Sequence, residues 1–196
     1  MIFVFLQKNI PLNVMSVVDN DDKIQKTLKY ADELRYFEGT IKDKYKFKEV
    51  EVFRTVRTNP PTDEDLIPLH YQHVNSLEFF PVEITQDIVD ALSDEEKGKE
   101  VGHRALSMVK TPEKCIKEAR RALRSYIEKK KPSHEAIEDY KKKRGMYVAK
   151  FKITPNIGLI TDFHKATHAQ VLLYEDVKIE DVWDSSSPVI PFKYEE

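Results

Sequence analysis

The segment RALSMVKTPEKCIKEARRALRSYI, residues 104–127, decides how this chain is organised. Its first six residues, 104–109, are mostly apolar and predict a short strand. Thr111, Pro112 and Glu113 then predict a helix start. Threonine can cap the free amide groups, proline suits the first helical position, and an acid is favourable in the first turn. The apolar residues that follow recur at helical spacing. The sequence therefore predicts a strand that leads directly into a long amphipathic helix.

A second strand is expected earlier in the chain, over residues 45–56. Apolar and polar residues alternate there, with a slip of phase near Glu49, as in a half-buried strand. The sequence Asn59-Pro60-Pro61 ends this strand, because proline cannot donate to a ladder.

Residues 1–44 are expected to form an N-terminal appendage to a main domain that spans residues 45–196. An apolar run at residues 2–6 predicts a strand or a hydrophobic arm. Apolar residues at helical spacing between Asn20 and Gly39 predict a helix that ends at the glycine.

After the long helix, the chain is expected to hold one more helix and then mainly strands. Pro132 breaks the helical pattern, residues 134–143 predict a second helix, and Gly145 ends it. Further strands are predicted at residues 146–153, 157–160, 168–174 and 177–183. Helices early and midway, with strands dominating the last third, predict the α+β class.

Residues 62–103 combine an acidic start with aromatic residues and histidines, among them His70, Tyr71 and His73. Long irregular segments are often lids or binding loops, and aromatic faces stack on nucleotide bases. Tyr71 is therefore a candidate lid residue. The spacing of His70 and His73 could place both on one helical face, but no acidic or cysteine partner lies near them. We expect histidines packed against tyrosines, and no metal site.

The composition is that of a globular protein. The chain has 196 residues, and a chain of this size buries about 70% of its surface on folding. Lys and Arg number 32 against 34 Asp and Glu, a formal net charge of -2. This balance argues against a dedicated nucleic-acid binder, although it allows a local basic patch.

Cysteine usage and hydropathy bear on the compartment. Cys115 is the single cysteine, which excludes an intrachain disulfide and a cysteine-based zinc site. The first ten residues lack the basic segment of a signal peptide, and no apolar stretch reaches the length of a membrane span. We expect a soluble, cytoplasmic protein with no membrane partner.

Three stretches, taken in order, resemble motifs of the ADP-ribosyltransferase-like superfamily. FRTVR at residues 53–57 is similar to its arginine-bearing strand, and HRALSMVKTPE at residues 103–113 to its serine-bearing strand and following helix. HAQVLLY at residues 168–174 is similar to the strand that carries the catalytic acid. The turn NPPTDED (59–65) and the segment GMYVAKF (145–151) also resemble small bacterial or phage proteins with RES-type domains.

The resemblance implies a split, mostly antiparallel sheet with flanking helices and a pocket for NAD or another nucleotide. It implies transfer of ADP-ribose or cleavage of NAD. Arg54 would hold a phosphate or the ribose, since a guanidinium binds such groups in an oriented, bidentate way. Ser107 would shape the side of the pocket that holds the nicotinamide ribose. His103 is a further candidate, with strand entry as its structural alternative.

One position departs from the superfamily pattern. Gln170 stands where the resemblance places a catalytic glutamate, and a neutral amide cannot act as a base. His168, two residues earlier on the same strand face, and Glu175, just past the strand, are the other catalytic candidates. The missing acid favours an alternative function, a catalytically inactive protein that contacts another protein or a nucleic acid.

The basic residues have structural alternatives. Arg54 and Arg57 would point to opposite faces of a regular strand, so at most one of them should face a pocket. The other would form ion pairs on a solvated edge. Residues 117–144 are rich in lysine and arginine. We expect them to form a solvated helical hairpin rather than a surface for nucleic acid.

Overall fold

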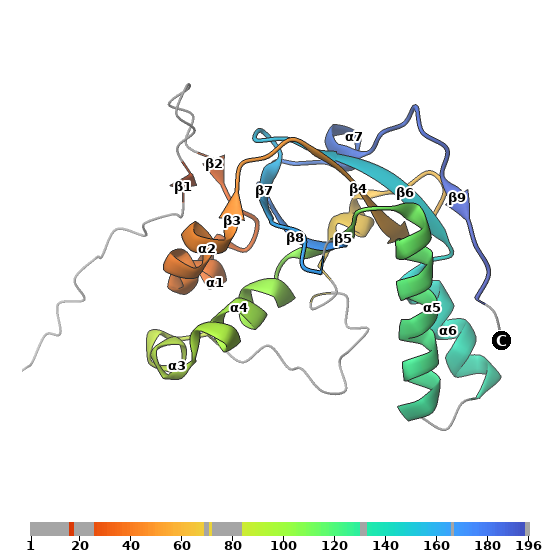
Figure 1. Ribbon diagram of the computed structural model, residues 1–196, viewed down its shortest axis with the longest axis horizontal. Coiled ribbons are helices and arrows are strands. Elements are labelled where there is room, and N and C mark those ends of the chain that lie inside the picture. Colours follow the sequence, from red (N-terminus) through yellow and green to blue (C-terminus); the bar gives the residue numbers. More distant parts are fainter. Residues whose placement is uncertain are drawn as a thin grey trace, which may run out of the picture.

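The computed structural model describes residues 16–17, 26–68, 71, 84–129, 133–165 and 167–194. Its main feature is a seven-stranded antiparallel sheet with the strand order β3-β7-β8-β5-β4-β6-β9 (Figure 1). The strands are β3 (Tyr45–Lys46), β4 (Val50–Val56), β5 (Leu106–Val109), β6 (Tyr147–Ile153), β7 (Gly158–Thr161), β8 (His168–Leu173) and β9 (Ile190–Pro191). A separate pair joins β1 (Ser16–Val17) to β2 (Lys26–Thr27).

Helices flank this sheet in two groups (Figure 1). The first group consists of α1 (Ala31–Leu34), the 3-10 helix η1 (Arg35–Phe37), α2 (Glu38–Lys44), α3 (Gln86–Ala91) and α4 (Asp94–His103). The second consists of α5 (Pro112–Lys129), which packs against β4, β5 and β6, and α6 (His134–Arg144), which lies beside α5. Two short helices, η2 (Asp63–Leu66) and α7 (Ile179–Val182), lie in the connections. The α+β class is confirmed.

The sheet is weakly joined between β4 and β5. These two strands pair at one position, Phe53 opposite Val109. By contrast, β4 pairs with β6 along its whole length, and β5 pairs with β8 along its whole length. The strands β4 and β5 therefore part on one side of this position, and the candidate site lies there.

Each face of the sheet buries its own core, because side chains alternate between faces along a strand. One core takes Val52, Met108 and Phe151 from the central strands, together with the first group of helices. The other takes Phe53, Val109 and Val148, which pack with α5 and α6. Ser107 belongs to the second face, one residue before Met108 and two before Val109.

The expected strand over residues 45–56 is two strands in the structure. β3 pairs with β7 at one edge of the sheet, whereas β4 pairs with β5 and β6. The slip of phase at Glu49 lies in the connection between them. The slip thus marks a crossing from one part of the sheet to another.

The prediction of a helix between Asn20 and Gly39 is wrong about where the helix starts and where it ends. Residues 26–27 form β2, and Leu28 makes a bridge with Tyr174. Helix α1 begins only at Ala31, after Tyr30 in a left-handed conformation, and Gly39 lies inside α2. Pairing with the end of β8 overrides the helical spacing of the apolar residues.

The strand expected over residues 177–183 is also wrong, because this segment holds the short helix α7. The Asp181 carboxylate accepts a hydrogen bond from the Lys178 amide at 2.8 Å, and the Asp63 carboxylate accepts one from the Ile179 amide at 2.7 Å. Such local bonds to free amide groups compete with a strand ladder.

The described part of residues 1–44 is tied into the same core as the sheet. Leu28, Leu34, Phe37 and Ile41 are all buried with residues of β4, β5 and β8. The apolar run at residues 2–6 lies outside the described residues. Among the helices that are described, none has the length and apolar character needed to cross a bilayer.

Gly145→Ala tests how closely α6 is attached to β4. Gly145 has φ +92°, and an added Cβ would lie 2.1 Å from the Val56 carbonyl oxygen. Such a backbone conformation costs other residues about 1–3 kcal/mol, and here the backbone contact adds to it. We expect the free energy of unfolding, measured in urea, to fall by at least about 2 kcal/mol.

Gly39→Ala is the matched control. Gly39 lies in α2 with no atom within 4 Å of an added Cβ. Alanine should be neutral or stabilise by up to about 1 kcal/mol at an exposed helical position. Equal effects of the two substitutions would contradict the close contact at Gly145.

Candidate functional site

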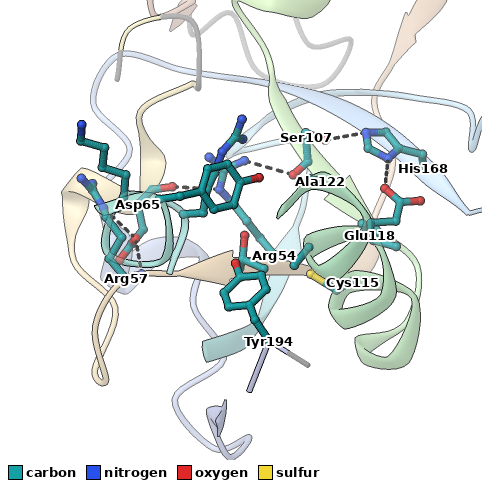
Figure 2. Close-up of a pocket in the computed structure, with 15 residues that line it drawn as sticks. Arg54, Arg57, Asp65, Ser107, Cys115, Glu118, Ala122, His168 and Tyr194 are labelled. Carbon is teal, nitrogen blue, oxygen red and sulfur yellow. Dashed lines mark hydrogen bonds and ion pairs between the residues drawn. The ribbon is translucent and has the colours of Figure 1, made fainter. Parts of the chain in front are cut away.

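A cavity of about 150 Å³ lies where β4 and β5 part, and α5 and α6 cover it (Figure 2). Strand residues Arg54, Ser107 and His168 line it from β4, β5 and β8. Glu118 of α5 and the end of α6 complete the walls. Three of the residues predicted from sequence are thus brought together.

Ser107, His168 and Glu118 form a chain of polar contacts along one wall (Figure 2). The Ser107 Oγ lies 2.5 Å from the His168 Nε2, and the His168 Nδ1 lies 3.3 Å from the Glu118 Oε2. The ladder between β5 and β8 sets the first contact, since Val109 pairs with His168 and Ser107 with Gln170. Both ring nitrogens of the histidine are therefore engaged, one by a hydroxyl and the other by a carboxylate.

Arg54 is the buried cation of the site. Its Nε donates to the Asp65 carbonyl at 3.1 Å, its Nη1 to the Ser107 carbonyl at 3.0 Å, and its Nη2 to the Ile67 carbonyl at 3.3 Å. Burial lowers the pKa of Arg54 to about 10, and the nearby Asp65 carboxylate opposes this shift. The guanidinium therefore keeps its charge near neutral pH.

Asp65 is buried and fixes the turn after β4. Its carboxylate accepts hydrogen bonds from the amides of Arg57 and Thr62, each at 3.0 Å. The Arg57 Nε lies 3.5 Å from the same carboxylate. The charge of Asp65 is thus matched locally by Arg57, as burial of a carboxylate requires.

The cavity has an excess of positive charge. Among the residues that the structure describes, four cationic side chains line it, Arg54, Arg57, Lys143 and Arg144, against two carboxylates, Asp65 and Glu118. The Lys143 ammonium also lies 2.6 Å from Asp139, which is half-exposed on the same helix. A concave site lined mainly by one sign of charge attracts ligands of the other sign. The cavity favours an anionic group.

Arg54 of β4 and Arg57, which directly follows β4, both line the cavity. The sequence analysis expected at most one of them to face a pocket. Arg57 follows the last residue of β4, where strand alternation no longer applies. Arg54 lies on the face opposite Phe53, but its guanidinium reaches the carbonyl of Ser107 where β4 and β5 part. Because β4 and β5 pair at only one position, Arg54 can reach the cavity although its side chain starts on the other face of the sheet.

Gln170 is not among the residues that line the cavity. Its Oε1 accepts a hydrogen bond from the Tyr45 hydroxyl at 2.9 Å, and its amide packs closely on Gly102. Burial raises the pKa of Tyr45, so the phenol stays a donor. The amide of Gln170 therefore links β8 to β3 and α4.

The remaining predicted residues also lie away from the cavity. His103 ends α4, with its Nδ1 at 3.6 Å from Glu100. Tyr71 stacks on Tyr30 with ring centroids 4.1 Å apart, and its hydroxyl donates to Glu33 at 2.9 Å. Glu175 is exposed in the turn after β8. His70 and His73 lie outside the described residues.

The sequence analysis did not identify the charged lining residues that the two helices contribute, Glu118, Lys143 and Arg144. Lys143 and Arg144 belong to the basic run that was expected to be solvated throughout, and they face the cavity because α6 ends there. Their position directly before Gly145, which was expected to end the helix, was the sequence signal that could have set them apart from the rest of the run. Glu118 carried no local signal, since it is one of many charged residues on α5.

Cys115 lies on the floor of the cavity but is a poor nucleophile. Its thiol is buried, and desolvation raises its pKa to about 12 although Arg54 acts in the opposite direction. A thiol with such a pKa is neutral at physiological pH, and the thiolate is the reactive form.

Comparisons with known proteins found no match: no family model fits the chain, and neither the curated proteins nor the solved structures contain a significantly similar one. The geometry of the cavity therefore carries the functional argument.

The reactivity of Cys115 tests the depth of the cavity floor. At pH 8 we expect the native protein to react with DTNB at least about a hundredfold more slowly than the same protein in guanidinium chloride, because unfolding restores an ordinary thiol pKa near 8.5. Cys115 is the single cysteine, so the absorbance reports this thiol alone. Free cysteine in both solutions corrects for the solvent, and a native rate within tenfold of the unfolded rate would contradict the burial.

Proposed function

We propose that the protein binds an anionic nucleotide in this cavity, with NAD as the first ligand to test. One observation carries the proposal: Arg54, Ser107 and His168 converge from three strands on a cavity that has an excess of positive charge. Phosphate groups are the anions that all nucleotides share, and guanidinium and ammonium groups bind them strongly.

The size of the cavity limits which part of a nucleotide it can enclose. A volume of about 150 Å³ is below the range of roughly 300–1,000 Å³ that is common for sites enclosing a whole small ligand. We infer that one group enters, a phosphate or a ribose, and that the rest of the nucleotide lies over the rim. Lys143 and Arg57, both near the protein surface, would contact it there.

Transfer of ADP-ribose or cleavage of NAD stays part of the proposal, with a different acid. Breaking the bond to nicotinamide develops positive charge on the ribose, and a nearby carboxylate stabilises it. Gln170 and Glu175 do not line the cavity, and Asp65 is matched by Arg57. Glu118 is the carboxylate that remains, at 44% side-chain exposure.

A second candidate function is contact with an acidic macromolecule through α5. The outer face of this helix carries Lys117, Arg120, Arg121 and Arg124, with Glu113 and Glu128 at its ends. A surface with this charge suits an acidic segment of a partner protein. This helix face is distinct from the cavity, so the two candidates can be tested separately.

Lys143→Glu should weaken nucleotide binding without harming the fold. Reversal of one charge at the rim should raise the dissociation constant for NAD or ADP-ribose about tenfold, equivalent to about 1.4 kcal/mol. The measurement is the rise in melting temperature with ligand concentration, because a ligand that binds only the native state stabilises it by mass action.

The control is Lys142→Glu, the same charge reversal one residue earlier and away from the cavity. It should change the dissociation constant by no more than about twofold, since Lys142 does not line the cavity and solvent screens its exposed charge. An absence of any shift with nucleotides, or equal losses in both variants, would refute the proposed site.

The combined variant Lys117→Glu, Arg121→Glu and Arg124→Glu separates the second candidate from the first. It should leave nucleotide affinity unchanged within about twofold, because these residues lie at a different surface. Retention of the wild type on heparin that depends steeply on salt and is lost in this variant, together with no nucleotide binding, would favour the second candidate.

A further inference from the structure

The contacts among Ser107, His168 and Glu118 are more than anion binding requires. A hydroxyl that only contacts a phosphate needs no base beside it, and a histidine that only binds an anion needs no carboxylate behind it. Here the Ser107 Oγ is 2.5 Å from the His168 Nε2, and Glu118 engages the His168 Nδ1 at 3.3 Å. A nucleophile within reach of a base that a third group orients is the arrangement of covalent catalysis.

We propose that Ser107 is a nucleophile, activated by His168 and positioned by Glu118, in the hydrolysis of an ester that carries a negative charge near its scissile bond. The proposal uses the same cavity as nucleotide binding, but it does not require that the ligand there be a nucleotide. Ser107 and His168 would touch the reacting atoms, whereas Glu118 acts through the histidine.

The proton path follows from the two contacts. In the first step the Ser107 Oγ bonds to the ester carbonyl carbon, its proton moves to the His168 Nε2, and the carbonyl oxygen becomes an oxyanion. The oxyanion then collapses, the bond to the alcohol oxygen breaks, and His168 gives that oxygen the proton. A water molecule repeats both steps, which releases the acid and restores the Ser107 hydroxyl.

The oxyanion needs a hydrogen-bond donor, and Arg54 is the candidate. Its Nη1 donates to the carbonyl of Ser107 itself, so the guanidinium is held against this residue. A guanidinium has five N–H groups, and backbone carbonyls take three of those of Arg54. Donors that are fixed before reaction, in a site shielded from water, are the most effective stabilisers of developing negative charge.

The charge of the lining selects an anionic ester. Both carboxylates of the cavity are engaged, Asp65 by Arg57 and Glu118 by His168. Lys143 and Arg144 lie at the α6 side of the same cavity. The volume of about 150 Å³ admits an acyl group of a few heavy atoms, which leaves the charged part of the ester at the rim.

The first test is covalent labelling of the full-length protein by diisopropyl fluorophosphate. The Ser107 oxygen would bond to phosphorus, fluoride would leave, and the serine proton would pass to His168. We expect one adduct in the intact mass and peptide mapping that locates it at Ser107. Ser107→Ala should abolish the adduct, and His168→Ala should slow labelling about 10²- to 10⁴-fold, the usual contribution of a general base.

The positioning role of Glu118 has its own readout. Glu118→Gln keeps the shape of the side chain but removes its charge, and should lower the maximal rate constant of labelling roughly a hundredfold or more. The reagent concentration at half-maximal rate should change little, because the substitution keeps the shape of the cavity wall. Ser186→Ala is the matched control, since the Ser186 hydroxyl bonds to a carboxylate at 2.5 Å rather than to a histidine. Its labelling should equal that of the wild type.

A second measurement keeps the proposal open to refutation if Ser107→Ala does not fold. Ser107→Cys places a thiol beside His168, and we expect iodoacetamide to alkylate it much faster than the buried Cys115 of the wild type. Adding His168→Ala should remove the advantage. Circular dichroism and the melting temperature show which variants are folded, and rates are compared only among those.

Turnover tests the choice of substrate. The wild type should hydrolyse 5-acetoxy-2-nitrobenzoate, which carries a carboxylate, with a kcat/KM at least about fivefold above that for p-nitrophenyl acetate. Lys143→Glu should remove this preference. Equal values for the two esters in the wild type would overturn the anionic class.

The outcomes distinguish this inference from nucleotide binding. A folded wild type with no adduct at Ser107, or labelling that His168→Ala leaves unchanged, would overturn the nucleophile. Labelling at Ser107 without any nucleotide-induced rise in melting temperature would support the nucleophile and refute the nucleotide. A nucleotide-induced rise in melting temperature without labelling at Ser107 would support nucleotide binding and refute the nucleophile.

Discussion

The buried guanidinium of Arg54 is the interaction on which the candidate site depends. Strands β4 and β5 pair at a single position, so the backbone groups beside it need other partners. Arg54 donates to carbonyl oxygens of two segments, the turn after β4 at Asp65 and Ile67, and strand β5 at Ser107. A buried charge is tolerated only where it is well hydrogen-bonded, and here the requirement is met by the backbone. The same bonds hold a positive charge beside the serine of β5.

That arrangement explains why polar groups gather at this point of a mostly apolar core. The ladder between β5 and β8 brings Ser107 beside His168, and α5, which starts directly after β5, carries Glu118 over the histidine. The end of α6 adds Lys143 and Arg144. Cys115 on the same helix is shut off from this chemistry, because desolvation keeps its thiol protonated. The cavity therefore offers one hydroxyl with a base beside it, inside a cationic wall.

Local signals predicted an element well where a cap marks its start, as at Pro112 of α5. The slip of phase near Glu49 lies between β3 and β4, although one continuous strand was predicted there. The failures have a common cause. Leu28 joins a bridge to Tyr174, and α7 depends on Asp63 from a distant segment, so partners far along the chain decided both. The same distinction applies to the site. Ser107 and His168 lie on strands that the sequence predicts, whereas Glu118 reaches them only through the packing of α5 against the sheet.

The position of Gln170 changes what the resemblance to ADP-ribosyltransferase-like motifs can mean for chemistry. The amide is committed to Tyr45 and Gly102, so the strand position that the resemblance gives to a catalytic acid serves as a structural link here. The carboxylate available to the cavity comes instead from a helix, and its contact with the His168 Nδ1 directs its charge to the imidazole. An acid placed behind a histidine strengthens a base, whereas an acid facing a ribose stabilises a cation. The geometry of Glu118 therefore favours chemistry that begins with proton removal from Ser107, and a role toward a ribose would require this carboxylate to leave the histidine.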